Sequence, residues 1–500
     1  MNISNYYDEQ KNSRSYQELE EFHGPDLNST LSTREFNNDD MHRSLELNSA
    51  VIVSDDTFTV GQAINTLGFG SFQVKLSLIT GLCWMADSME ITILSILSPI
   101  LHCDWKITRY EQALITTVVF LGMVLSSTFW SNLSDRYGRK KTLTLCGLLL
   151  FYYGFLSSFA PNFLWILLLR GLVGFAIGCV PQSVTLYAEF LPSDQRAKCV
   201  VLLDCFWALG ACFGIVLALI VMPNFGWRWL LGISTIPLFL FSLFTPWLPE
   251  SVYFDLLIGK IDNALCTLKR VARENNKPMP IGRLVLDRVQ TNSRNKWSEL
   301  LSRQMYKTTI LLWIVWMASA FCYYGIVLIT TELLNTNSDR CNIREKNENC
   351  QTNCNLSGSD YIDILWTTLA EFPGIFSTIF LIEKIGKKLT MVIQLLLFAI
   401  VVYFLSRACL LSRFVLTVGL FLSRGLIAGV FQAAYVYTPE MYPNYLRDRG
   451  VSTCTAMARF GAMITPYVAI IFIQSSSLIA MSLYCLTAIS AAIAIIALPR

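Results

Sequence analysis

The sequence predicts an all-α membrane protein that crosses a bilayer twelve times. Hydrophobic residues fill 53% of its 500 positions and charged residues only 15%, whereas soluble domains carry about 25% charged residues. Apolar windows of about 20 residues, long enough to span a bilayer, recur along the chain. Lysine and arginine gather in every second connection between these windows, as they do on the cytoplasmic side of membrane proteins.

The apolar windows form two groups of six. The first group lies at 76–101, 112–131, 143–160, 163–188, 199–222 and 229–248. The second group lies at 309–331, 361–382, 389–406, 414–437, 450–473 and 478–498. We therefore expect an N-terminal six-span half over 58–251 and a C-terminal six-span half over 308–500, in parallel pseudo-repeat.

The segments outside the spans have distinct compositions. Residues 1–57 are polar and acidic and have too few apolar groups to fold alone, so we expect a disordered cytoplasmic tail without a cleavable signal peptide. Between the halves, segment 252–307 is basic. Apolar residues recur there at helical spacing, which predicts an amphipathic helix on the membrane or under the bundle: Ile261, Leu265, Leu268 and Val271.

The positive charges also set the orientation. They place both termini and the central segment in the cytoplasm, so loop 335–359 faces a lumen or the exterior, where disulfides persist. Asn355 begins an Asn-Leu-Ser glycosylation sequence in this loop. Two of the three loop cysteines can pair, while an undecorated loop with free thiols is the alternative: Cys341, Cys350 and Cys354.

The two halves repeat each other in sequence. "SDRYGRKK" (134–141) after the second span matches "IEKIGKKL" (382–389) after the eighth. "LLLRGLVGFAIG" (167–178) matches "LFLSRGLIAGVF" (420–431), which makes Arg170 and Arg424 equivalent intramembrane arginines. Parallel repeats of six spans with a site between them are typical of one transporter architecture.

Two carboxylates interrupt the first span. Asp87 and Glu90 lie in "WMADSMEITIL" (84–94), close to mid-bilayer and three residues apart, hence on one helical face. A charge at that depth costs about 2.5–3.5 kcal/mol on the lenient insertion scale. We expect the pair to bind a cationic group or to carry a proton. A structural pair satisfied by a neighbouring helix is the alternative.

Other residues inside the spans complete a candidate site. Glu371 precedes Pro373 in the eighth span, where a helix break would free backbone groups to line a cavity. Arg459 in the eleventh span either shares this cavity or is a plain counter-ion to Asp87. Aromatic residues beside acids suit an organic cation or an amphiphile, although each ring alone could be core packing: Tyr323, Tyr324, Trp366 and Tyr435.

These motifs resemble the major facilitator superfamily. The resemblance rests on the "DRYGRKK" loop, its second-half echo, Arg170 and "PES" (249–251), while "GVFQAAYVYTPEMYP" (429–443) resembles a vesicle-membrane branch kin to the organic ion transporters. It implies alternating access and a cytoplasmic latch that gates rather than binds solute. The gating residues are Asp135, Arg136, Gly138, Arg139, Lys140, Glu189, Arg196, Glu383, Lys384, Gly386, Lys387, Glu440 and Arg447. Glu189 and Arg196, at the end of the fourth span, are the expected partners of Arg139.

The sequence therefore favours a secondary carrier of a small, charged organic solute in a vesicle membrane, coupled to protons or another ion. The alternative is a non-transporting vesicle protein that binds a ligand or partner and regulates vesicle function. We find no phosphate-binding glycine loop, metal-spaced histidine or cysteine set, or nucleophile elbow. We expect no enzyme activity, cofactor, metal or nucleic-acid partner, and the expected partners are the solute, protons and lipid.

Overall fold

A computed structural model describes most of the chain outside the acidic N-terminal tail. The described residues are 57–285, 299–340, 356–407, 412–443, 446–473 and 476–499. The tail, the sequon at Asn355 and the loop cysteines Cys341, Cys350 and Cys354 lie outside these ranges. Among the described residues, two short strands, β1 (Thr57–Thr59) and β2 (Arg283–Val285), pair in parallel; helices form the rest of the regular structure.

The first half contains six spans. Its helices are α3 (Val60–Leu67), α4 (Ser71–Asp104), α5 (Arg109–Tyr137), α6 (Arg139–Ser157), α7 (Phe163–Ile177), α8 (Pro181–Glu189), α9 (Ser193–Ser234) and α10 (Ile236–Phe244). α7 and α8 together form the fourth span. α9 is two helices joined across a kink at Gly226, whose φ of 78° breaks the helical backbone. This kink separates the fifth span from the sixth.

The second half repeats this layout. Its helices are α14 (Tyr306–Arg340), α15 (Gly358–Leu369), α16 (Glu371–Ile385), α17 (Lys387–Leu405), α18 (Arg413–Met441), α19 (Arg447–Pro466), the π-helix η4 (Tyr467–Phe472) and α21 (Ser477–Ala497). The eighth span consists of α15 and α16, which meet at Ala370, ahead of Pro373. The backbone of Ala370 stays right-handed helical (φ −59°, ψ −23°), so the break that the sequence predicts is only a local irregularity.

The number of spans agrees with the sequence. Among the described residues, ten helical segments are long and apolar enough to cross a membrane. One of these segments, Ser193–Trp247, holds the two spans on either side of Gly226. α6, with 19 residues, adds the remaining one. Twelve spans result, and each overlaps its predicted window.

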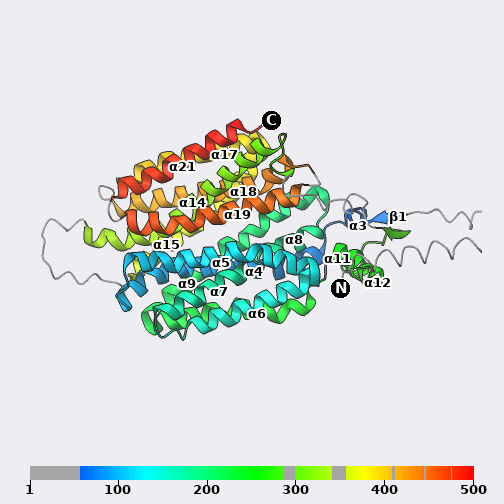
Figure 1. The fold of residues 1–500 in the computed structure, drawn as a ribbon, viewed down its shortest axis with the longest axis horizontal. Helices are drawn as coiled ribbons and strands as arrows, with labels where there is room; N and C mark the ends of the chain where they lie inside the picture. Colours follow the sequence, from blue (N-terminus) through cyan, green and yellow to red (C-terminus); the bar gives the residue numbers. More distant parts are fainter. Residues whose placement is uncertain are drawn as a thin grey trace, which may run out of the picture. The chain divides into compact units, whose positions relative to one another are not determined.

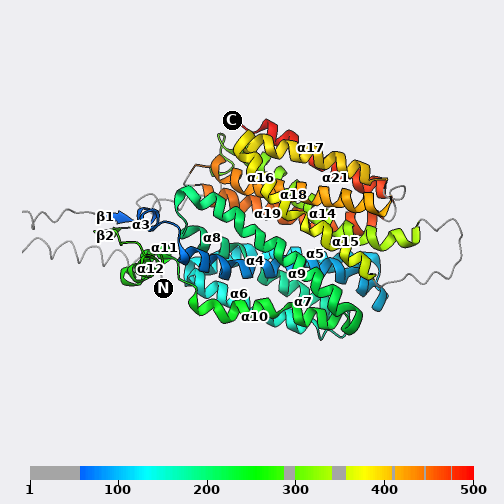
Figure 2. The ribbon, with the colours of Figure 1, turned by 180° about the vertical axis from the view of Figure 1, so that it is seen from behind.

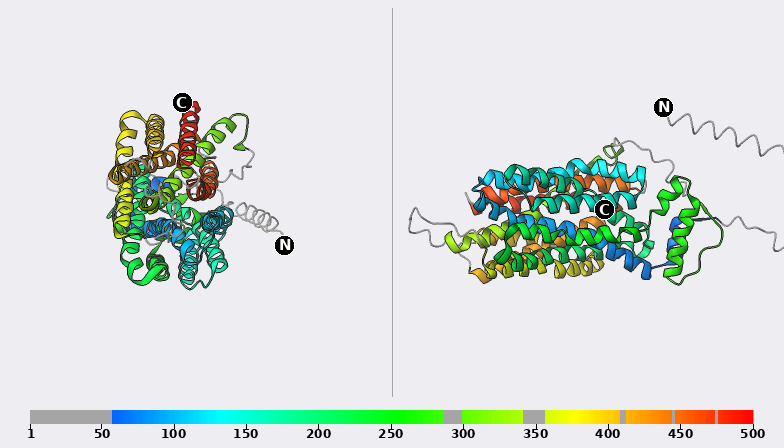
Figure 3. Two further views of the ribbon diagram at one scale, coloured as in Figure 1. Left: turned by 90° about the vertical axis from the view of Figure 1, so that its left-hand side faces the viewer. Right: turned by 90° about the horizontal axis from the view of Figure 1, so that it is seen from below.

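The helices gather in two groups that follow the sequence halves. Figures 1 and 2 show the blue-to-green helices of the first half beside the yellow-green-to-red helices of the second, and the end-on view in Figure 3 separates the same two groups. α5 of the first half packs on α19 of the second, and α9 packs on α15. The boundary between the halves therefore runs through the middle of the bundle.

A glycine sets the spacing of two helices at this boundary. A Cβ atom on Gly210 of α9 would lie 2.1 Å from the carbonyl oxygen of Met85 in α4. Any larger residue would push the first and fifth spans apart. The close approach brings the middle of α4, with Asp87, next to the middle of α9.

The central segment packs against one end of the first half, which we call the α12 end. It follows the 3-10 turn η1 (Thr245–Trp247) that ends the sixth span, and it contains α11 (Val252–Leu257) and α12 (Ile261–Glu274). Leu268 and Val271 of α12 are buried, whereas Ile261 is 49% exposed. α12 contacts α3, α4 and α11, so it packs against this end of the first half. The opposite end of the bundle is called the far end below.

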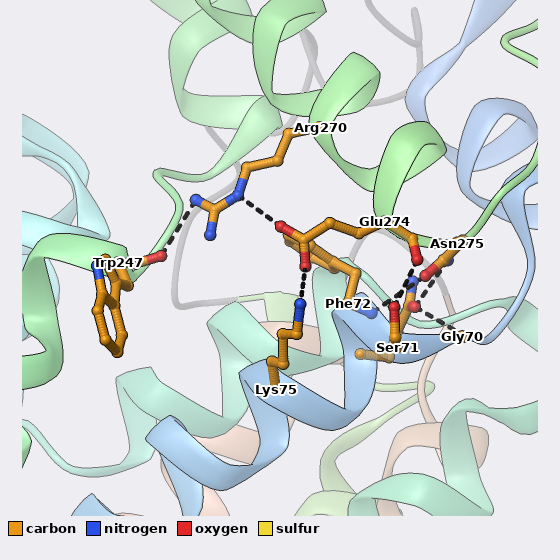
Figure 4. A network of polar contacts seen from close by, with 9 residues as sticks. Gly70, Ser71, Phe72, Lys75, Trp247, Arg270, Glu274 and Asn275 are labelled. Atoms are coloured by element: carbon orange, nitrogen blue, oxygen red, sulfur yellow. Dashed lines mark hydrogen bonds and ion pairs between the residues drawn. The ribbon is translucent and has the colours of Figure 1, made fainter.

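The end of α12 holds the beginning of α4 (Figure 4). Ser71 donates to the Glu274 carbonyl at 2.5 Å, and the Phe72 N–H donates to Asn275 Oδ1 at 3.1 Å. The Glu274 carboxylate also pairs with Lys75 at 3.1 Å and with Arg270 at 2.9 Å. Because α4 has no side-chain cap of its own at Gly70, these contacts anchor the first span to the central segment.

Candidate functional site

A cavity lies at the boundary between the halves and is lined by residues of both. Its volume is about 860 Å³, including the part open to solvent. α4, α5, α7, α8 and α9 line it from the first half, and α14, α16, α18 and α19 from the second.

Eight aromatic side chains form much of the cavity wall. Successive ring centroids lie 5.4 Å apart for Trp84 and Trp207, 6.4 Å for Trp207 and Tyr323, and 5.3 Å for Tyr323 and Tyr324. The full set is Trp84, Phe120, Trp207, Trp316, Tyr323, Tyr324, Phe431 and Tyr435. Faces of such rings attract cations through their quadrupoles.

Asp87 belongs to this wall. Its side chain lines the cavity, and the residue is only 7% exposed. Among the residues that the structure describes, Oδ1 of Asp87 is buried and has no hydrogen-bond partner. A buried charge without a partner is costly, so Asp87 is the group in the cavity that most needs a ligand or a proton.

Glu90 has a different environment from Asp87. It is absent from the cavity wall, and its Oε2 accepts a hydrogen bond of 2.5 Å from Arg170 Nη1 in α7. Both side chains are almost fully buried. The expectation that the two carboxylates share one site is therefore corrected: a neighbouring helix satisfies Glu90, which is the structural alternative, and Asp87 alone faces the cavity.

Glu371 is the corresponding acid of the second half. Its Oε1 accepts from Arg424 Nε at 2.8 Å and from the Tyr323 hydroxyl at 2.9 Å. Tyr323 in turn accepts from Trp207 Nε1 of the first half at 2.7 Å. Unlike Glu90, Glu371 also lines the cavity. The two equivalent arginines, Arg170 and Arg424, thus each neutralise a buried glutamate within their own half.

Arg459 lines the same cavity without pairing with Asp87. Its Nη1 donates to the carbonyl oxygen of Met123 in α5 at 3.0 Å, across the boundary between the halves. Within the described part of the chain no ion pair joins it to Asp87. Arg459 therefore shares the cavity wall with Asp87, and the two charges lie close enough to attract each other there.

Trp366 is the predicted aromatic residue that the structure places elsewhere. It lies in α15, is 57% exposed and is not part of the cavity wall, unlike Tyr323, Tyr324 and Tyr435. The periodicity of a short broken helix does not tell which face turns inward, and here Trp366 points out of the bundle. The prediction that Trp366 lines the solute site is therefore wrong.

Asp204 is a cavity residue that the sequence analysis missed. It lies in α9 and accepts from Trp84 Nε1 at 3.0 Å and from the side-chain amide of Gln432. The signal was present, because Asp204 is the lone charge in "VVLLDCFWALG" (200–210). The rule that singled out Asp87, that a charge inside a span is functional by default, applies equally here.

The loop motifs lie at the α12 end. Arg139 pairs with Glu189 at 2.8 Å, the contact that the sequence predicts, and Lys387 pairs with Glu440 in the equivalent place of the second half. The other predicted gating residues of this end make local contacts or are exposed: Asp135, Arg136, Lys140, Arg196, Glu383, Lys384, Gly386 and Arg447. Their gating role remains a prediction.

Glu250 of the "PES" motif connects the same loop to the sixth span. Its Oε1 accepts from the backbone N–H groups of Arg139 and Lys140 at 2.7 and 3.1 Å, at the first turn of α6. A carboxylate is favoured at a helix N-terminus. Gly138 must remain glycine here, since its φ is +98° and a Cβ would lie 2.4 Å from Glu250 Oε2.

Different contacts join the halves at the two ends. At the α12 end, Lys198 pairs with Glu383 at 3.0 Å, and both side chains are exposed. At the far end, Glu332 of α14 accepts from Gln112 of α5 at 3.0 Å and lies 3.6 Å from Arg109, and Glu332 and Gln112 are buried. The sequence analysis missed this far-end contact because 220 residues separate Gln112 from Glu332.

One cysteine at the far end is oxidised. Cys103, near the end of α4, is disulfide-bonded, whereas ten other described cysteines are free. The sequence analysis grouped the loop cysteines with one another and left Cys103 aside. The loop cysteines themselves stay outside the described residues.

Comparison with known proteins identifies the family. The profile described as "Sugar (and other) transporter" matches residues 55–338. Synaptic vesicle 2-related protein of Bos taurus is 50% identical over 451 residues, which cover 89% of this chain and 81% of the relative. The chain belongs to the major facilitator superfamily. As a member of this transporter superfamily it is not an enzyme, and the resemblance seen in the loop motifs is confirmed.

Further relatives of this major facilitator protein agree in fold and length. Organic cation/carnitine transporter 7 of Arabidopsis thaliana is 34% identical, with 83% of this chain and 88% of the relative covered. Among solved structures, the inward-open form of the xylose transporter XylE from E. coli superposes with a TM-score of 0.65 at 14% identity. It covers 86% of this chain and 96% of XylE, and shows the shared fold alone.

Proposed function

We propose that this major facilitator protein is an alternating-access carrier of a small organic cation, which it exchanges for a proton across a vesicle membrane. The observation that carries the proposal is Asp87, a buried cavity acid with an Oδ1 that has no partner among the described residues. Such a group is stabilised either by a bound cation or by a proton. A carrier in which Asp87 alternately holds the cation and the proton exchanges one for the other across the membrane.

The charges of the cavity favour a cation over an anion. Three carboxylates line it, those of Asp87, Asp204 and Glu371. Two guanidinium groups oppose them, since Arg459 lines the cavity and Arg424 pairs with Glu371. Three negative against two positive charges leave one negative charge. Aromatic faces around it supply further attraction for an alkylammonium group.

The contacts between the halves support alternation. Lys198–Glu383 joins the halves at one end and Gln112–Glu332 at the other, so each end has its own polar contact that opening of that end would break. The positive charges of the central segment make the α12 end the cytoplasmic one. The relatives named for synaptic vesicles and the one named for organic cations support the vesicle location and the solute class.

The test uses proteoliposomes that contain a pH-sensitive dye. Choline is the probe, and 3,3-dimethylbutan-1-ol, which has the same shape without the charge, is the neutral control. We expect saturable choline uptake with proton movement in the opposite direction, and no response to the alcohol. The Asp87→Asn variant should lose both the choline uptake and the proton movement. Asp194→Asn, which changes an exposed acid at the beginning of α9, should behave like the wild type.

Two results would contradict the proposal. Choline uptake that persists in Asp87→Asn would remove this residue from recognition and coupling. Saturable, Asp87-dependent binding without any flux would mean that the protein is a ligand-binding regulator and not a carrier.

A further inference from the structure

We infer that Asp204 is a second recognition carboxylate, and that a cation bound there replaces the amide of Gln432 and so releases a link between the two halves. The inference rests on the proposed function, because it needs an organic cation in the cavity. It goes further by naming the contact through which occupancy of the cavity reaches the boundary between the halves.

The position of Asp204 makes this exchange possible. One oxygen accepts from Trp84 of α4, in its own half, at 3.0 Å, and the other accepts from Gln432 of α18, in the opposite half. All three residues line the cavity. A solute in the cavity therefore meets the Asp204 carboxylate at the place where the two halves are joined.

The chemistry gives the exchange a direction. Both present donors of Asp204 are neutral, an indole N–H and an amide N–H. A cationic group offers the Asp204 carboxylate a full opposite charge, and in a largely buried site this attraction exceeds that of the neutral amide dipole, so the cation displaces the amide. The Trp84 contact lies within one half and survives, which keeps the carboxylate oriented for the cation.

A second contact on the same helix shows what the release would change. Trp207 follows Asp204 by three residues on α9, so the two side chains lie on one face, and it donates to Tyr323 of the opposite half. α9 is thus held to the second half by two bonds less than one turn apart. A cation that breaks one of these two bonds favours the form in which the halves are open. The equilibrium between the closed and open forms shifts by the difference in the cation's affinity for the two forms.

The decisive variant is Gln432→Leu, which frees Asp204 from its competitor. Choline binding to the purified full-length protein in nanodiscs, measured by calorimetry, should tighten roughly threefold to tenfold, because more of the protein is competent to bind. Asp204→Asn should weaken binding at least tenfold by removing the charge. In the Asp204→Asn background, Gln432→Leu should have no further effect.

Gln394→Leu is the matched control. Gln394 is also a buried glutamine of the second half, but its amide bonds to Thr378 within that half at 2.7 Å. It should leave choline affinity at the wild-type value. Hydrogen exchange provides an independent readout: choline should raise exchange in α9 and α18 of the wild type, whereas Gln432→Leu should show the raised exchange without choline.

Each result has a distinct meaning. Unchanged or weaker choline binding in Gln432→Leu, with wild-type binding intact and dependent on Asp87, would overturn the inference and leave the proposed function standing. Absence of choline binding to the wild type would overturn the proposed function, and the inference would fall with it.

Discussion

Trp207 of the first half donates a 2.7 Å hydrogen bond to the hydroxyl of Tyr323 in the second half. The same hydroxyl donates to Glu371, which Arg424 neutralises. Tyr323 is 7% exposed, so this chain of contacts is largely shielded from water. It links the boundary between the halves to the buried ion pair of the second half.

Tyr323→Phe should weaken the folded protein. The substitution leaves the Trp207 N–H without its acceptor and removes one of the two donors to Glu371 Oε1, which keeps Arg424. An unsatisfied buried group costs about 1–3 kcal/mol. We expect a clearly lower midpoint of thermal unfolding in detergent. Tyr484→Phe is the control, since its buried hydroxyl has no partner among the described residues and its loss should be neutral or stabilising. Equal effects of the two substitutions would contradict the role of Tyr323.

Asp87 and Glu90 should separate into a solute-binding and a structural residue. Glu90→Gln leaves the guanidinium of Arg170 buried without its counter-ion, at a cost of about 3–5 kcal/mol, so the yield of folded protein should collapse. Replacing both partners, as Glu90→Met with Arg170→Met, should recover folding.

Asp87→Asn should fold like the wild type and fail to bind choline. Size-exclusion chromatography of the solubilised protein, followed by calorimetry, distinguishes the two residues. A well-folded Glu90→Gln that has lost choline binding would show that Glu90 belongs to the solute site after all.

The two ends of the bundle should respond differently to salt. Lys198 and Glu383 are 70% and 58% exposed, and such pairs contribute about 0–1 kcal/mol and are screened at high ionic strength. Raising the salt concentration should therefore favour opening of the α12 end, while the buried Gln112–Glu332 contact changes little. The readout is the labelling rate of a cysteine introduced at the cavity residue Ala428, with reagent added from each side.

Swapping the two charges of the Lys198–Glu383 pair tests whether this pair holds the α12 end closed. Glu383→Lys alone should increase labelling from the α12 end by up to about fivefold, which corresponds to about 1 kcal/mol. Adding Lys198→Glu should restore the wild-type rate and its salt dependence. Failure of the double variant to restore them would mean that the pair does not hold the end closed.

The anchor between α12 and α4 should loosen in acid. Although burial acts to raise it, the pKa of Glu274 is lowered from its ordinary 4.5 by the hydrogen bonds and charges of Arg270 and Lys75. A lowered folded pKa means that the contribution to stability is present above 4.5 and is lost as pH falls through the folded value. Hydrogen exchange at the beginning of α4 should increase below pH 4.5 in the wild type, and Glu274→Gln should show the increase at neutral pH.

Local patterns in the sequence predict the spans. Apolar windows mark all twelve of them, because such a window depends only on neighbours along one helix. The contact between Arg139 of α6 and Glu189 of α8 was expected from the family resemblance of the loop motifs and not from local spacing. Asp87 and Asp204 follow from a single rule about charges inside spans, although only the first was singled out.

Such local patterns do not predict which residues of distant helices contact one another. Asp87 and Glu90 lie on one helical face, and only the position of α7 decides that Glu90 meets Arg170 while Asp87 meets the cavity. The prediction for Trp366 was wrong for the same reason, because the outward direction of its side chain depends on how α15 packs. Gln112 and Glu332 carry no shared motif, since their meeting is set by the closure of the two halves.

The buried ion pairs also determine how the protein responds to an electric field. Glu90 with Arg170 and Glu371 with Arg424 cancel inside the halves that carry them, so their movement transfers no net charge. The remaining charged cavity groups, Asp87, Asp204 and Arg459, sum to one negative charge. A transmembrane potential of 100 mV acts on one elementary charge with about 2.3 kcal/mol. The empty carrier would therefore reorient under voltage, whereas a bound monovalent cation would make the loaded carrier electrically silent.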